Sequence, residues 1–98
     1  MKEYFDVFGK LLSHLEQSLS DEEDVDFSVV TPLLDQMEEL TNRIPKLQQQ
    51  KKDVEFYKKN IESLFKKGVS SGYKVSAFEQ LKREKELLQE FAKTHGLF

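Results

Sequence analysis

The chain has 98 residues, which is enough for one small domain and not for two. Hydrophobic residues make up 38% of the chain and charged residues 34%, and eight Phe and three Tyr supply large side chains to bury, so the composition favours a folded globular domain over disorder. The net charge is only −3, and the absence of cysteine excludes a disulfide scaffold, a thiolate metal site and thiol catalysis.

The first predicted element is an amphipathic helix over residues 3–19. Its large apolar residues recur at steps of three and four, which is the spacing of one buried helix face. These residues are Tyr4, Phe5, Phe8, Leu11, Leu12, Leu15 and Leu19. Gly9 lies inside the helix and costs about 1 kcal/mol relative to Ala unless a neighbour packs against its bare backbone. Residues 20–26 are strongly acidic and are predicted to form a turn.

The second predicted helix begins at Thr31 and Pro32, since Thr is a good N-cap and Pro is favoured at the first helical position. Its apolar stripe is Leu33, Leu34, Met37, Leu40 and Ile44. Pro45 disfavours helical geometry at the preceding residue and lacks a backbone donor, so the chain is expected to kink or break there.

A long third helix is predicted over residues 46–67. Leu47, Val54 and Ile61 recur every seven residues, which resembles a coiled-coil seam extending to Leu64. Two lysines and then Gly68 are expected to end the helix, because cations favour the last turn and glycine adopts the left-handed conformation that follows it.

A loop is predicted over residues 68–75, followed by a fourth helix that starts at Ser76, where Ser76 and Glu79 have capping-box spacing. The apolar residues assigned to this helix are Phe78, Leu81, Leu88, Phe91 and Ala92. Four helical segments with short connections in one domain of residues 1–98 predict an all-α antiparallel bundle.

Motifs for chemistry are missing from the sequence. It has no glycine-rich phosphate loop, no His-Glu-x-x-His and no nucleophile elbow, so we expect neither enzymatic activity nor a cofactor. His14 and His95 lie on different predicted helices, where solvated helix edges explain them more simply than a shared metal ion. Asp24, Asp26 and Asp35 have calcium-loop spacing, but Val29 replaces the required glycine, so a solvated acidic turn is expected.

Charge is distributed unevenly along the chain. Residues 1–40 carry 11 acidic and 2 basic side chains, a net −9, whereas residues 41–98 carry 13 basic and 7 acidic side chains, a net +6. Lysine doublets at 51–52, 58–59 and 66–67 recur on the side of the third helix opposite its seam. This stripe is either a solvated helix face or a surface for an anionic partner. Only two arginines occur, which favours an acidic protein over nucleic acid.

Apolar residues outside the predicted stripes either cap the bundle ends or form a patch for a partner. We hypothesise that a partner protein binds in an apolar groove formed by three such residues, while three lysines attract its acidic side chains. These candidate partner-binding residues are Phe27, Val30, Phe98, Lys58, Lys59 and Lys66.

Three functions remain open at this point. The first is a non-enzymatic protein-binding module, such as a regulator, an adaptor or an export-type chaperone. The second is a homodimer formed through the seam from Leu47 to Leu64, and the third is a nucleic-acid-associated regulator that uses the lysine stripe. No apolar run reaches the roughly 20 residues that span a bilayer, and the N-terminus lacks a signal-peptide core, so a cytoplasmic location is expected.

Two families offer a general resemblance. An acidic turn at residues 24–27 precedes a helix that reads Leu33-Leu34-x-x-Met37-Glu38-Glu39-Leu40. This layout resembles that of flagellar export chaperones, which are small helical-hairpin proteins that hold an export substrate. The small size and the helical bundling are also similar to those of bacteriocin immunity proteins. Neither resemblance assigns a role to a particular residue.

Overall fold

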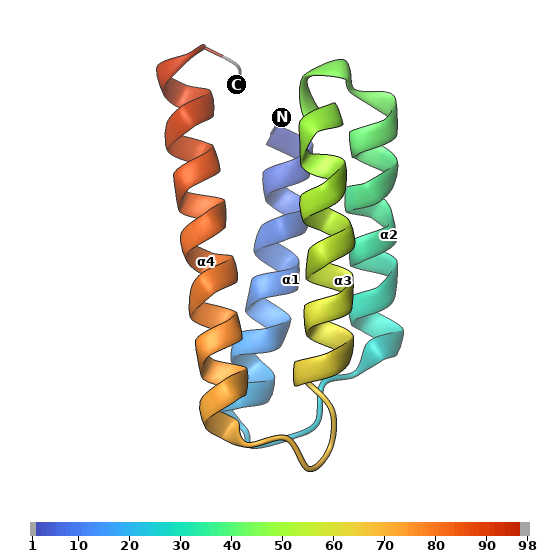
Figure 1. The fold of residues 1–98 in the computed structure, drawn as a ribbon, viewed down its shortest axis with the longest axis vertical. Coiled ribbons are helices and arrows are strands. Elements are labelled where there is room, and N and C mark those ends of the chain that lie inside the picture. The colour runs from blue at the N-terminus through green and yellow to red at the C-terminus, as the bar shows by residue number, and fades with distance from the viewer. Residues whose placement is uncertain (1, 97–98) are drawn as a thin grey trace.

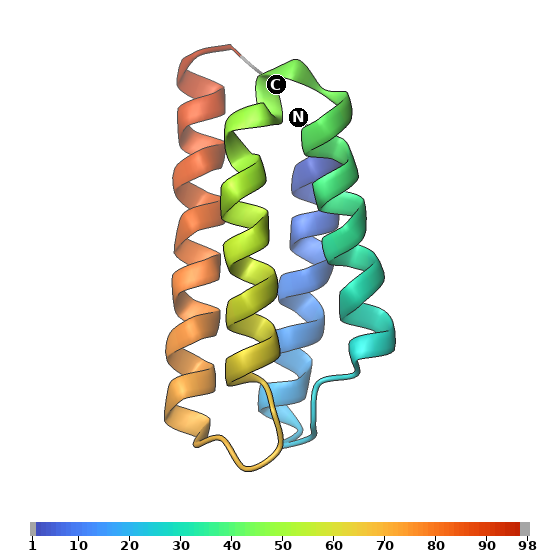
Figure 2. The ribbon, with the colours of Figure 1, turned by 45° about the vertical axis from the view of Figure 1, so that its right-hand side comes forward.

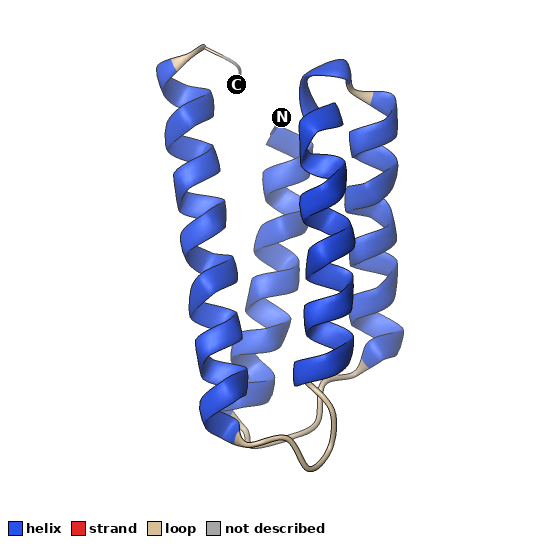
Figure 3. Ribbon diagram, in the orientation of Figure 1, coloured by secondary structure: helices blue, strands red, loops and turns tan. Residues whose placement is uncertain are grey.

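Four helices and one short 3₁₀ segment make up residues 2–96, the part of the chain that the computed structural model describes (Figure 1). The elements are α1 (Lys2–Ser20), α2 (Phe27–Arg43), η1 (Pro45–Gln50), α3 (Lys51–Leu64) and α4 (Ser71–Thr94). Short loops join them, and residues 2–96 contain no strand (Figure 3). The predicted all-α antiparallel bundle is confirmed.

The helices form a ring around one core. α1 packs against α2 and α4, and α3 packs against the same two helices (Figure 2). The contact between α3 and α4 is the least extensive of these four. Lys2 and Thr94 lie at the same end of the bundle, because an even number of antiparallel helices returns the chain to its starting end. None of the helices within residues 2–96 combines the length and the apolar character that a membrane crossing needs.

The apolar stripe of α1 forms the centre of the core, as predicted. Tyr4 contacts Phe5 and Phe8 edge-to-face, with ring centroids 5.9 and 6.0 Å apart. Phe8 in turn meets Tyr57 of α3 with a centroid separation of 5.5 Å, which joins α1 and α3 across the bundle. The seam predicted for the third helix also points inward, since Leu47, Val54 and Ile61 are fully buried. It is therefore part of the core of a single chain and is not free to contact a second copy.

The start of α2 corrects the prediction for the second helix. The helix begins at Phe27 and is capped by Asp26, whose carboxylate accepts hydrogen bonds from the Ser28 backbone N–H at 2.9 Å and from its hydroxyl at 2.6 Å. Thr31 therefore does not cap the helix, and Pro32 lies inside it. The N–H that Pro32 lacks would have bonded the carbonyl of Ser28, and Ser28 is exposed, so water can satisfy that group.

Pro45 breaks the chain rather than kinking one long helix. Ile44 is extended, with φ −103° and ψ 113°, and ends α2. Pro45 then opens η1, which leads into α3. The third helix predicted over residues 46–67 is thus divided between a 3₁₀ segment and a shorter α-helix.

Both ends of the loop between α3 and α4 also differ from the prediction. α3 ends at Leu64 with Phe65 as its C-cap, so the lysines at 66 and 67 lie outside the helix. Gly68 has the expected left-handed conformation, with φ 89°. α4 begins at Ser71, five residues earlier than predicted, because the Ser70 hydroxyl caps it by accepting from the Gly72 backbone N–H at 3.4 Å.

Candidate protein-docking surface

The three apolar residues predicted to form a partner groove do not do so among the described residues. The prediction for Val30 is wrong, because its side chain is fully buried in the core and is unavailable to a partner in the folded chain. Phe27 is half-buried at the start of α2 and packs against the same core. Phe98 lies outside the described residues.

The three candidate lysines differ in their surroundings. Lys58 donates to Asp35 of α2 at 2.9 Å and also pairs with Glu38 of the same helix. The Glu38 and Asp35 carboxylates raise the pKa of Lys58. Lys58 therefore stabilises the contact between α2 and α3, while Lys59 and Lys66 are exposed.

The acidic turn and His95 make contacts within the chain itself. Residues 27–35 are helical, so the calcium-loop spacing that ends at Asp35 does not correspond to a loop. The hydrogen bonds from Ser28 lower the pKa of Asp26. His95 stacks on Phe91, with ring centroids 4.1 Å apart. Residues 2–96 contain no group of three or more potential ligand side chains arranged for a metal ion.

The structure reveals a surface that sequence analysis did not predict, beside the contact between α3 and α4, which is the least extensive of the four between neighbouring α-helices. Leu87 of α4 lines this contact and is 56% exposed. Phe91 of α4, one turn after Leu87, is 51% exposed, and Phe56 of α3, three residues after the lining residue Asp53, is 49% exposed, so helical spacing places both on the same side of their helices as the contact. A hollow of about 260 Å³ separates the two helices at this level. Its lining residues are Gln50, Asp53, Tyr57, Glu84, Leu87 and Leu88.

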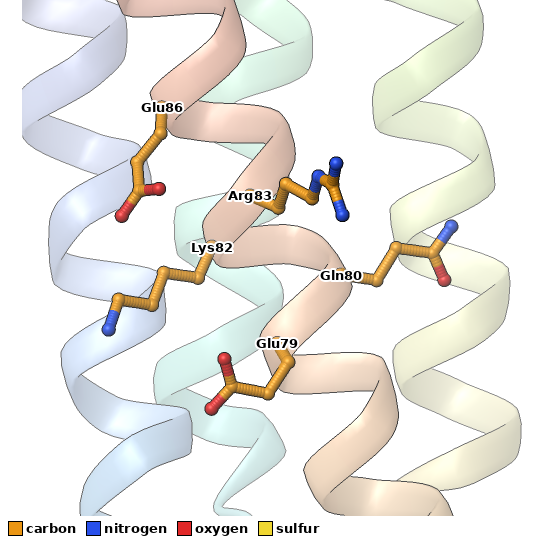
Figure 4. Close-up of a pocket in the computed structure, with 5 residues that line it drawn as sticks. All are labelled: Glu79, Gln80, Lys82, Arg83 and Glu86. Carbon is orange, nitrogen blue, oxygen red and sulfur yellow. The ribbon is translucent and has the colours of Figure 1, made fainter.

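Helical spacing groups cations with these apolar residues. On α3, Lys52 precedes Phe56 by four residues and Lys59 follows it by three, so both lie on the same outer face. On α4, Arg83, Leu87 and Phe91 follow one another at four-residue steps. Arg83 points toward the side of α4 on which α3 lies (Figure 4). We call the set of Lys52, Phe56, Lys59, Arg83, Leu87 and Phe91 the α3–α4 face.

The cations of the α3–α4 face form no salt bridge within residues 2–96. Lys52, Lys59 and Arg83 are exposed, and none has an acidic partner within 4.0 Å among residues 2–96. The salt bridges in this range involve only two cations, Arg43 and Lys58. The α3–α4 face therefore combines exposed apolar groups with cations that are free to pair with a partner's carboxylates.

The hollow beneath the face has a different character. Burial raises the pKa of Tyr4 and of Tyr57, and the negative charges of Asp53 and Glu84 raise both further. The Tyr4 hydroxyl is buried and has no hydrogen-bond partner within residues 2–96. The lining of the hollow thus carries two carboxylates, exposed Asp53 and half-buried Glu84, beside the neutral phenol of Tyr57.

A larger depression on α4 is a weaker candidate. It measures about 540 Å³, and its lining residues Glu79, Gln80, Lys82, Arg83 and Glu86 are all exposed and all come from one helix (Figure 4). Their side chains spread apart over the outer surface of α4, some toward α1 and others toward α3. No second element encloses a ligand there, so the depression is a shallow part of a charged helix surface.

Sequence reasoning missed the three apolar residues of the face for a specific reason. Phe91 was assigned to the core of the fourth helix, yet it is half exposed, while its neighbour Ala92 is fully buried. Phe56 likewise stands next to the buried Tyr57. Phe91 and Phe56 are each the immediate neighbour of a core residue, and consecutive residues lie about 100° apart around the helix axis. This angle could have placed both outside the core.

The sequence matches no family model, no curated protein and no solved structure. The functional assignment therefore rests on the geometry and the charge of the chain itself.

Proposed function

We propose that this chain is a non-enzymatic, cytoplasmic protein-binding module and that it binds its partner through the α3–α4 face. The observation that carries the proposal is the exposure of Phe56, Leu87 and Phe91 beside the least extensive helix contact of the bundle. Monomeric proteins rarely leave large apolar side chains grouped on the surface unless that surface is covered in use.

The free energy of burying these three apolar side chains is too small to hold a partner by itself. Complete burial of a Leu or Phe side chain is worth about 1.5–3 kcal/mol, and each of these three is already about half buried. Docking therefore gains about 2–4 kcal/mol from them, whereas a micromolar complex needs about 8 kcal/mol. The partner must accordingly contact both helices and the surrounding polar groups.

Two alternatives have less support. A homodimer through the predicted seam would require Leu47, Val54 and Ile61 to leave the core in which they are buried. A nucleic-acid regulator would use the lysine stripe, but Lys58 is bound to two carboxylates of α2, and large apolar groups lie among the free cations. Neither alternative explains why those apolar groups are exposed.

Site-specific photo-crosslinking tests the proposal. A benzoylphenylalanine residue replaces Phe56, Leu87 or Phe91 in separate variants, which are irradiated in the cells that naturally make the protein. Val29 is the matched control, since it is an apolar residue of α2 with 40% exposure. We expect the same protein adduct from the three face positions and none from Val29. Absence of a discrete adduct from the face, or an equal adduct from Val29, contradicts the proposal.

A further inference from the structure

The α3–α4 face carries charge in a defined arrangement across its width. Lys52 and Lys59 lie on the outer side of α3, beyond Phe56 as seen from α4. Arg83 lies on α4, one turn before Leu87. Apolar side chains therefore occupy the middle of the face, and two lysines lie at its α3 edge. At the α4 edge, Arg83 stands among three exposed glutamates at helical spacing, Glu79, Glu86 and Glu90.

The shape of the face favours a helical ligand. Two neighbouring antiparallel helices form a long shallow groove, in which the apolar stripe of a third helix can pack. Binding of an extended peptide by strand addition is excluded, because residues 2–96 contain no strand for it to pair with. α3 is 14 residues long, so a ligand helix of about 14–18 residues covers the length of the face.

From this arrangement we infer that the partner contributes an acidic amphipathic helix, which docks along the α3–α4 face as a fifth helix of the bundle. This inference rests on the proposed function and specifies the chemistry of its partner. The apolar stripe of the ligand covers Phe56, Leu87 and Phe91. Its acidic residues lie on the α3 side of that stripe and face Lys52 and Lys59, which form no salt bridge within residues 2–96.

The two carboxylates of the hollow restrict the register of the ligand. Asp53, which is exposed, and Glu84, which is half-buried, line the hollow between α3 and α4. An acidic ligand residue above them would be repelled, so the ligand must place apolar residues there. Its carboxylates then lie toward Lys52 and Lys59, which form no salt bridge within residues 2–96.

A second copy of this chain does not supply such a helix. The apolar stripes of α1 and α2, which belong to the acidic half of the chain, are buried in its own core. Either helix would have to leave its bundle to dock elsewhere. The ligand is thus assigned to a different protein.

Two matched peptides test the inference. Both are fluorescein-labelled helices of about 18 residues with the same leucine stripe, and the flanking positions are Glu in one and Lys in the other. Fluorescence anisotropy measures their affinities for the full chain, and ¹⁵N-HSQC spectra locate the bound peptide. We expect the acidic peptide to bind at least about tenfold more tightly, to weaken as salt is added and to shift amide signals of α3 and α4.

Charge-reversal variants separate the face from general charge effects. The double variant Lys52→Glu and Lys59→Glu should weaken binding of the acidic peptide about tenfold. Lys10→Glu removes an exposed lysine of α1 and should leave the affinity within about twofold, since it lies on a different helix. Both variants keep the core intact, and circular dichroism checks their fold.

The outcomes distinguish this inference from the proposed function. If the face cross-links to a protein but the two peptides bind equally, or the basic peptide binds more tightly, the acidic helix is wrong and the docking function stands. If neither adduct nor peptide binding is found, both are wrong. A cross-linked adduct with twice the mass of the chain identifies a second copy as the partner and overturns the inference.

Discussion

Two phenylalanines nine residues apart provide a direct test of the exposed face. Phe65 caps the end of α3 and is 1% exposed, whereas Phe56 lies on α3 and is 49% exposed. Phe65→Ala should cost about 3–5 kcal/mol, because it removes a fully buried ring and leaves a cavity. Phe56→Ala loses about 1 kcal/mol of partial burial and regains about 0.5 kcal/mol of helix propensity, a net cost of about 0.5 kcal/mol.

Urea unfolding followed by circular dichroism at 222 nm measures both costs. A domain of 98 residues has a total stability of about 5–15 kcal/mol, so Phe65→Ala removes a large part of it and should lower the Tm by about 12 °C or more. Phe56→Ala should leave the unfolding midpoint almost unchanged. Equal destabilisation by the two substitutions would refute the reasoning, because it would mean that Phe56 is buried in solution and that the α3–α4 face is not open.

Three further predictions concern stability. Asp26→Ala should destabilise the chain at pH 7, because it removes the N-cap of α2, whereas Thr31→Ala should be neutral or stabilising. The cost of Asp26→Ala should be lost as the pH falls below 3.8 and through the lowered pKa of the Asp26 carboxylate. Urea melts at pH 7 and pH 3 compare the variants. Gly9→Ala should stabilise by about 1 kcal/mol in thermal melts, since the nearest atom to an added Cβ is a flexible lysine carbon at 3.9 Å. Tyr4→Phe should stabilise by about 1 kcal/mol, because it removes a buried hydroxyl that has no partner within residues 2–96. The raised pKa of Tyr4 also means that the wild type should lose more stability than this variant as the pH rises above 10.0 in a urea titration series.

The apolar periodicity of the sequence was sufficient to predict the helix number and most of the core. The stripe of α1 and the seam at Leu47, Val54 and Ile61 are buried as expected. Such stripes are informative because one helix face must be covered, whichever neighbour covers it.

The starts of α2 and α4 were harder to predict, because two residues near each start are suitable as an N-cap. Asp26 and Thr31 both fit an N-cap, and the earlier one prevails in α2, where the additional turn buries Val30 completely. Ser70 and Ser76 competed in the same way at α4, and again the earlier residue caps the helix. Local capping chemistry cannot choose between such residues, since packing against distant helices decides which additional turn is stabilised.

The candidate surface depends on rotation about the helix axis, which a single sequence leaves undetermined. Residues at three- and four-residue steps include both Phe91 and its neighbour Ala92, and only the position of the next helix determines which of them is buried. Here the small alanine faces the core and the large phenylalanine faces outward. The same holds for Phe56 and Tyr57, so the docking surface appeared only once the helices were placed around the ring.

The ring arrangement also has a consequence for synthesis of the chain. α1 leaves the ribosome first, yet one of its two neighbours is α4, which is made last. At about 5–20 residues per second, the side of α1 that includes Leu12 stays uncovered for several seconds until Phe78 of α4 is made. A nascent three-helix intermediate therefore presents an apolar surface to chaperones and proteases, and the pairing of the first helix with the last determines when that exposure ends.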